Sequence, residues 1–210
     1  MKSKQNLLTQ LNTLPYFTKV TVLQLCDQLN LKASTADTYI SRFLKYGEII
    51  KLKRGFYVTK DFFDRNVSDI SYTFYLANVL YRPSYISLWT ALQYYDIATE
   101  AIYSYTSVTT KVTRKYTTKI GGFSYRSIAK PLYTDMNLVK GKFDFFIASP
   151  SKALFDIIYF RTNQFRSIKT IDDINFLIDD LRIEIDEMDS KERDKFYNMI
   201  KRYKNIWMNS

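Results

Sequence analysis

The chain contains no histidine and only one cysteine among its 210 residues. Histidine is the commonest general base and a common metal ligand, and a single cysteine cannot form an internal disulfide. These absences exclude ordinary zinc sites and both Ser-His-Asp and Cys-His catalysis. Any remaining chemistry would have to use Asp, Glu, Lys, Ser or Tyr. We expect no catalytic site, no bound metal and no cofactor, and we expect Cys26, which lies among leucines, to be a core residue.

Long hydrophobic runs are also missing. Two long uncharged stretches that are rich in apolar residues, residues 70–81 and 83–95, are separated by Arg82 and fall short of the roughly 18 apolar residues that span a bilayer. The first six residues are not followed by the apolar core of a secretory signal. The sequence thus predicts a cytoplasmic protein that makes no contact with a membrane.

Positive charge is unevenly distributed along the chain. Residues 1–60 hold ten Lys/Arg against three Asp/Glu, residues 61–139 hold eight against six, and residues 140–210 hold thirteen against twelve. A phosphate backbone favours such a concentration because neutralising it releases counterions. A basic surface that only keeps the protein in solution is the alternative.

Apolar spacing predicts three helices in the first sixty residues. The first covers residues 5–14 and ends at Pro15, the second follows a cap at Thr21 and runs to residue 29, and the third covers residues 35–46 with Ser34 as its cap. Two extended pieces, residues 48–53 and 56–58, then flank a tight turn at Arg54 and Gly55. Three helices followed by a hairpin are the parts of a winged helix-turn-helix, a DNA-binding module.

The third helix has one apolar face, formed by Ala36, Ile40, Phe43 and Leu44, and one polar face. Arginine on such a face can bind guanine with two hydrogen bonds, and lysine suits phosphate. The hairpin, the turn before the third helix and the start of the second helix add further cations. The predicted DNA-contact residues are Lys19, Lys32, Thr35, Thr38, Tyr39, Arg42, Lys45, Lys51, Lys53 and Arg54. For each of them taken singly, a solvated surface position is the alternative.

A second, larger domain is expected after the hairpin. Residues 61–70 are charged and predict a linker, and residues 71–210 form the second domain. Its start predicts helices over residues 72–80 and 88–95, the latter capped by Ser87. Residues 102–147 predict three to five antiparallel strands, and three helices follow, the first capped by Ser149 with Pro150 behind it. The expected fold class is α+β: an N-terminal winged helix-turn-helix, then a larger α+β domain with a small antiparallel sheet and flanking helices.

Two catalytic motifs are present only in part. Residues 149–152 match the S-x-x-K pattern of serine acyl-enzymes, but no companion motif accompanies them, and a helix cap explains the same residues. Gly122 to Ser124 followed by Asp135 resemble a nucleotidyltransferase signature, yet Asn137 stands where the second metal-binding carboxylate is needed. The acidic run between residues 172 and 189 fits either a solvated helix face or a docking surface for a basic partner.

Three segments together resemble a known family. They are the end of the predicted hairpin, Lys53-Arg54-Gly55-Phe56-Tyr57; the segment Tyr85-Ile86-Ser87-Leu88-Trp89-Thr90-Ala91-Leu92; and the segment Ala148-Ser149-Pro150-Ser151-Lys152-Ala153-Leu154-Phe155-Asp156. This arrangement is similar to the AbiEi-type antitoxins of type IV toxin-antitoxin systems, which also act as transcriptional repressors.

The resemblance implies a bacterial abortive-infection protein with two activities. Its N-terminal domain would bind inverted repeats in double-stranded DNA at the promoter of its own operon, and its C-terminal domain would counteract a nucleotidyltransferase-like toxin in phage defence. Direct contact with that toxin stays open, as does the oligomeric state, because the sequence has no heptad seam. A stand-alone transcriptional regulator with an effector-binding second domain is the alternative function, and an enzyme acting on nucleic acid is a third.

Overall fold

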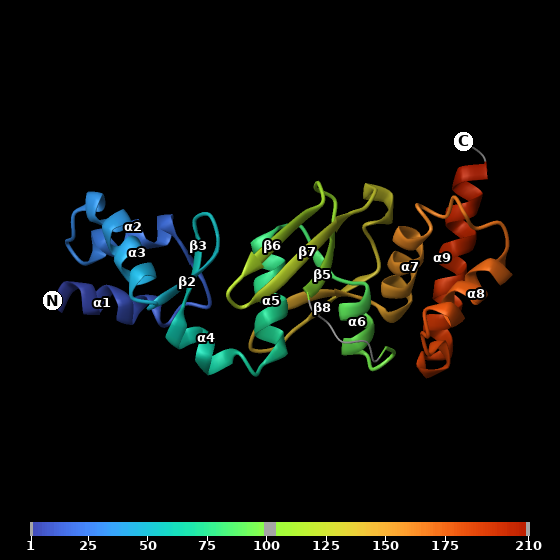
Figure 1. Ribbon diagram of the computed structural model, residues 1–210, viewed down its shortest axis with the longest axis horizontal. Coiled ribbons are helices and arrows are strands. Elements are labelled where there is room, and N and C mark those ends of the chain that lie inside the picture. The colour runs from blue at the N-terminus through green and yellow to red at the C-terminus, as the bar shows by residue number, and fades with distance from the viewer. Residues whose placement is uncertain (1, 99–103, 209–210) are drawn as a thin grey trace.

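The computed structural model describes residues 2–98 and 104–208, and it places helix α1 and helix α9 at opposite ends of an elongated molecule (Figure 1). We call residues 2–59 the N-terminal part and residues 60–208 the C-terminal part. The N-terminal part contains α1 (Lys2–Leu11), β1 (Phe17–Thr18), α2 (Lys19–Gln28), α3 (Ala36–Lys45), β2 (Ile49–Lys53) and β3 (Phe56–Thr59). The C-terminal part contains α4 (Lys60–Asn66), α5 (Ile70–Leu80), β4 (Tyr85–Ile86), α6 (Trp89–Tyr94), β5 (Ser104–Thr109), β6 (Arg114–Thr118), β7 (Gly121–Ser127), β8 (Met136–Val139), β9 (Phe145–Ala148), α7 (Pro150–Arg161), α8 (Ile171–Asp180) and α9 (Ser190–Met208). The α+β class is confirmed.

The first three helices lie close to their predicted positions, but two of their caps differ. Thr18 caps α2 in place of Thr21, and the two threonines form a reciprocal capping box. A 3-10 turn, Ala33–Thr35, precedes α3, so Thr35 takes the N-cap position predicted for Ser34 and makes no capping bond through its side chain. After α3, Gly47 has a φ of 69°, the left-handed conformation in which glycine commonly ends a helix.

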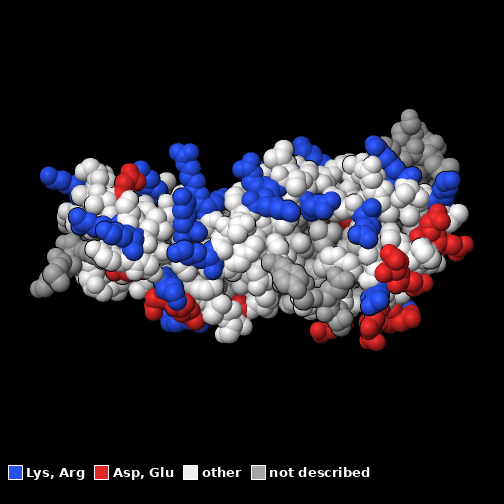
Figure 2. All heavy atoms as spheres, in the orientation of Figure 1, with Lys and Arg blue, Asp and Glu red and all other residues white. Residues whose placement is uncertain are grey.

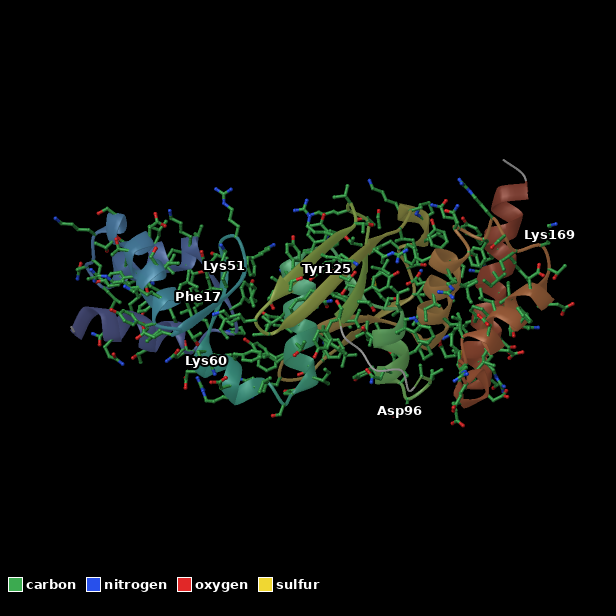
Figure 3. All side chains as sticks on the ribbon, viewed as in Figure 1. Phe17, Lys51, Lys60, Asp96, Tyr125 and Lys169 are labelled. Carbon is green, nitrogen blue, oxygen red and sulfur yellow. The ribbon has the colours of Figure 1, made fainter. Side chains whose placement is uncertain are left out.

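The small sheet has the strand order β1-β3-β2 and is antiparallel, so the predicted hairpin is present and β1 adds a third strand. Side chains alternate across a strand, and here both faces are buried. Ile49 and Tyr57 belong to the N-terminal core together with Phe17 (Figure 3). Ile50, Leu52 and Val58 belong to the larger core of the C-terminal part. The hairpin is therefore packed between the two cores.

The larger sheet differs from the antiparallel one that the sequence predicts. Its order is β6-β7-β5-β4-β9-β8, and β5 with β7 and β4 with β9 are parallel pairs. Strand composition identifies strands but not their partners, because pairing depends on contacts far apart in the sequence. The six strands form a mixed sheet, with α5 packed on β9 and β5, and α6 packed on α7.

The predicted linker contains a helix. Thr59 caps α4 by accepting a hydrogen bond from the Phe62 amide, at 3.2 Å. The charges that suggested a linker form two ion pairs at the helical i, i+4 spacing, Lys60 with Asp64 at 2.5 Å and Asp61 with Arg65 at 2.9 Å. The charged composition of this segment thus supports a surface helix.

The later helices agree with the sequence except at α6. Ser149 caps α7, as predicted, and Pro150 is its first residue. Ser87 was expected to cap α6. Its hydroxyl instead donates a hydrogen bond to Asp156, and Leu88 takes the N-cap position of α6. Over residues 2–98 and 104–208, no helix combines the length and the apolar composition needed to cross a bilayer.

Candidate nucleic-acid interface

Helix α3 presents a polar face to solvent and buries the opposite one. Thr38, Arg42 and Lys45 are exposed and recur at four- and three-residue intervals, which places them on one side of the helix. Ile40 and Phe43 are buried on the other side. Among the described residues, neither Arg42 nor Lys45 forms an ion pair, so both cations are available to an external anion.

The remaining predicted contacts around α3 are partly engaged within the protein. The Thr35 hydroxyl donates to the Lys32 carbonyl at 2.5 Å, and the half-buried Tyr39 ring stacks on Phe43. Lys19 is exposed but lies 2.7 Å from the Asp37 carboxylate. Lys32 has an exposed side chain. Thr35 and Tyr39 thus help to hold α3, whereas Lys32 remains on the surface beside it.

The hairpin carries two exposed cations, Lys51 and Arg54, with no ion pair among the described residues. Gly55 follows Arg54 with a φ of 74°, so the turn uses the left-handed conformation that glycine adopts without steric cost. The strand register shifts between Lys51 and Lys53. Such an irregularity re-aims the side chains beyond it, and Lys53 is accordingly half-buried whereas Lys51 is exposed.

Lys53 points into the contact between the two parts of the chain. Its ammonium donates to the carbonyl of Leu80, the last residue of α5, and lies 4.7 Å from the centre of the Phe56 ring. A cation beside helix-terminal carbonyls is favourable because they carry partial negative charge. Lys53, predicted as a DNA contact, therefore joins the hairpin to the C-terminal part, and we revise its assignment accordingly.

Three cations gather at this contact. Burial lowers the pKa of the Lys53 ammonium, and nearby Lys111 and Arg114 lower it further by repulsion. Lys111 and Arg114 are exposed and lie 5.6 Å and 5.9 Å from the centre of the Tyr81 ring. Mutually repelling cations with no carboxylate partner among the described residues are favourable sites for an external anion.

The predicted interface omits the cations between residues 104 and 134, because the charges of residues 61–139 taken together nearly balance. Within that range, residues 104–134 contain six Lys/Arg and no Asp/Glu. The fold places β6 against β2 and so brings this basic segment beside the hairpin. This run of residues without Asp or Glu is the sequence signal that indicates a basic segment here. The added exposed residues are Lys111, Arg114, Lys115, Lys119, Arg126 and Lys130.

Charge is separated along the molecule. In Figure 2, Lys and Arg are spread over the hairpin and the neighbouring sheet on the side facing the viewer, whereas most Asp and Glu lie, among further Lys and Arg, at the end formed by α8 and α9. The acidic end includes Asp179, Asp180 and Asp186, all exposed. We use the name basic surface for the exposed cations of α3, the β2–β3 hairpin, β6 and the turn that precedes β6: Arg42, Lys45, Lys51, Arg54, Lys111, Arg114 and Lys115.

A second group of polar residues is buried in the C-terminal part. The Asp156 carboxylate accepts hydrogen bonds from the Tyr85 hydroxyl at 3.0 Å and the Ser87 hydroxyl at 2.7 Å, and it pairs with the Lys152 ammonium. Lys152 is 1% exposed and Asp156 is 0% exposed. Burial raises the pKa of the Asp156 carboxyl, which Lys152 and the two hydroxyls oppose. We call these four residues the buried polar cluster.

This cluster explains the S-x-x-K pattern at residues 149–152. Ser149 accepts a hydrogen bond from the Lys152 amide as a helix cap, and the Lys152 ammonium is bound to Asp156. The Ser151 hydroxyl donates to Glu192 on α9 at 2.7 Å. The serines and the lysine thus hold α7 against its neighbours, as the cap interpretation predicts for Ser149.

Neither the protein-family models nor the curated proteins compared with this chain match it.

Proposed function

We propose that the protein is a DNA-binding transcriptional repressor whose residues 2–59 act as a winged helix-turn-helix. In this proposal α3 enters the major groove, Arg42 and Thr38 contact base edges, and Lys45 contacts phosphate. The β2–β3 hairpin is the wing, from which Lys51 and Arg54 contact the phosphate backbone.

One observation carries this proposal: the exposed cations of α3 and the hairpin have no carboxylate partner among the described residues, and they stand on a rigid support. Packing on both faces of the small sheet fixes the hairpin relative to α3. Because the backbone is already held in place, binding orders only the side chains, so more of their interaction with phosphate is retained as affinity. A basic surface that served only solubility would need no such fixed arrangement.

The test is operator binding by Arg42→Ala, measured by fluorescence anisotropy with duplex DNA from the promoter upstream of the gene. We expect affinity to fall by about 1–3 kcal/mol, because a base-contacting arginine is lost. The matched control is Lys191→Ala, which removes an exposed cation at the acidic end of the molecule. Equal binding by the two variants would contradict the assignment of α3 to the groove.

We further propose that the C-terminal part supplies the antitoxin activity that the family resemblance implies. Supporting this, two of the three resembling segments, residues 85–92 and 148–156, meet in the buried polar cluster, so they form one structural unit. The identity of the adjacent gene distinguishes an antitoxin from a stand-alone regulator at the least cost. A stand-alone regulator needs no gene for a nucleotidyltransferase-like toxin beside it.

Separating the two activities requires point variants. Deleting the first 65 residues would remove Ile50, Leu52 and Val58 from the core of the C-terminal part. We therefore expect Arg42→Ala to lose repression of a promoter reporter while still rescuing cells that express the toxin. Loss of rescue by this exposed substitution would contradict separable activities.

A further inference from the structure

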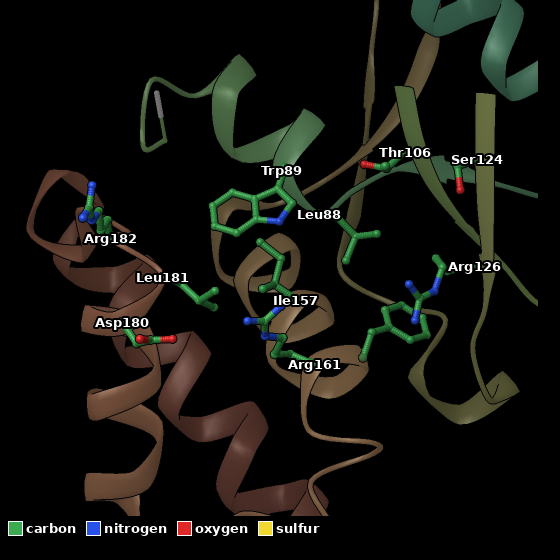
Figure 4. A pocket seen from close by; sticks show the side chains of 11 residues that line it. Leu88, Trp89, Thr106, Ser124, Arg126, Ile157, Arg161, Asp180, Leu181 and Arg182 are labelled. Carbon is green, nitrogen blue, oxygen red and sulfur yellow. The ribbon is translucent and has the colours of Figure 1, made fainter. Parts of the chain in front are cut away.

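A cleft of about 710 Å³ opens on the side of the molecule away from the hairpin, where α6, β7, α7 and the turn after α8 meet (Figure 4). Its size lies within the roughly 300–1,000 Å³ typical of small-molecule sites. Its walls combine three arginines with an indole. Arg126 comes from β7, Arg161 is the last residue of α7, and Arg182 follows α8.

The three guanidinium groups have no carboxylate partner among residues 2–98 and 104–208, although the exposed Asp180 also lines the cleft. Arg126 stacks on the Phe160 ring, with 4.6 Å between the guanidinium carbon and the ring centre, which leaves its N–H groups available to a ligand. Arginine keeps its charge at every physiological pH, so the cleft carries a net positive charge.

The indole of Trp89 provides a flat surface in the same space. Trp89 is the first residue of α6 and is half-buried. Figure 4 shows the Trp89 ring and the Arg161 guanidinium directed into the space between α7 and the turn after α8, with Arg126 approaching from the sheet. The Ser124 hydroxyl, on β7, lines the cleft as well. A planar group stacked on the indole would thus lie close to hydrogen-bond donors for an anion.

Two lining residues hold backbone conformations that favour glycine. Leu88 has φ 60° and ψ −146°, a region that is almost confined to glycine and costs about 1–3 kcal/mol. Arg182 has a φ of 52° at the position after α8 where glycine commonly closes a helix, with the Ile183 amide donating to the Ile178 carbonyl at 3.2 Å. The Arg182 conformation is a common way to close a helix, whereas the Leu88 conformation is strained and lies directly before the indole.

From these observations we propose that the cleft is a nucleotide-binding site. The guanidinium groups would bind the phosphates with paired hydrogen bonds, and the base would stack on Trp89. The Asp180 carboxylate and the Ser124 hydroxyl would accept hydrogen bonds from ribose hydroxyl or base amino groups. The same chemistry is offered by a free nucleotide and by the terminal nucleotide of a single strand, so the test includes both.

Fluorescence of Trp89 gives a direct readout. The chain has two tryptophans, so Trp207→Phe leaves Trp89 as the only tryptophan, which is excited at a wavelength that the tyrosines do not absorb. This variant is titrated with ATP, with a 5′-phosphorylated single-stranded oligonucleotide, and with adenosine and inorganic phosphate separately. Calorimetry on the unaltered chain repeats each titration. We expect ATP or the oligonucleotide to quench Trp89 fluorescence in a saturable way. Adenosine and phosphate should each bind at least tenfold more weakly. Whichever of ATP and the oligonucleotide binds more tightly identifies the ligand as a free nucleotide or as the end of a single strand.

Arginine variants then locate the site. We expect Arg161→Ala and Arg182→Ala each to weaken nucleotide binding at least tenfold, and Arg161→Lys to weaken it less because the charge is kept. The matched control, Arg166→Ala, removes an exposed arginine outside the cleft and should bind as the parent does. Arg42→Ala should also bind nucleotide normally, so this test is independent of operator binding. The proposal fails if neither ligand quenches Trp89, if phosphate binds as tightly as ATP, or if a folded Arg161→Ala/Arg182→Ala variant retains affinity.

Discussion

The basic surface and the buried polar cluster use the same kinds of side chain for opposite purposes. Arg42 and Lys51 stay in water with no partner among the described residues, whereas Lys152 is almost fully buried and bound to Asp156. An exposed cation costs little to keep and can bind an external anion, while a buried one requires a fixed partner. Burial, more than residue type, therefore separates a candidate contact from a structural residue.

The largest effect should come from breaking the buried polar cluster. We expect Asp156→Ala to lower the free energy of unfolding by about 3–5 kcal/mol, because it leaves the Lys152 ammonium buried without a partner. Urea unfolding measures this change. The double variant Lys152→Met/Asp156→Leu removes both charges and should recover part of the loss, because the buried Tyr85 and Ser87 hydroxyls still lack the acceptor that Asp156 provided. A single variant as stable as the parent would show that the cluster does not hold a buried ion pair.

Lys53 is half-buried, which places it between the exposed cations of the basic surface and the buried Lys152, and it provides the next test. Lys53→Met keeps the aliphatic length but removes the charged hydrogen bond to the Leu80 carbonyl, a kind of bond that contributes about 1.5–3 kcal/mol. We expect unfolding at lower urea concentration and a smaller loss of operator affinity than for Arg42→Ala. If Lys53→Met instead weakened DNA binding as strongly as Arg42→Ala and left stability unchanged, Lys53 would be a contact residue after all.

The smallest effect concerns the wing. We expect Lys51→Ala to reduce the slope of log affinity against log salt concentration by about 0.9, which corresponds to one phosphate contact. Stability should change by no more than about 0.5 kcal/mol, because the side chain is exposed. Anisotropy titrations at several salt concentrations measure the slope, with Lys191→Ala as the control. An unchanged slope would remove Lys51 from the interface.

The elements of the N-terminal part were largely predictable. Apolar spacing located α1, α2 and α3 within a few residues, and the Arg54-Gly55 turn located the hairpin, because these signals lie within one element or one turn. The pairing of β5 with β7 and of β4 with β9 was not predictable, since it depends on strands that are separated in the sequence. The use of Ser87 in the buried polar cluster was missed for the same reason: its partner lies 69 residues away.

The sequence by itself determined which residues carry charge, where the helices of the N-terminal part lie, and which face of α3 is polar, because each follows from composition or from the period of one helix. Only the tertiary structure decided which cations are available. It turned Lys53 to the end of α5, buried Lys152 beside Asp156, and brought the basic strand β6 beside the hairpin. The physical reason is that the electrostatic role of a side chain depends on its solvation and its neighbours, and these are set by contacts between distant segments.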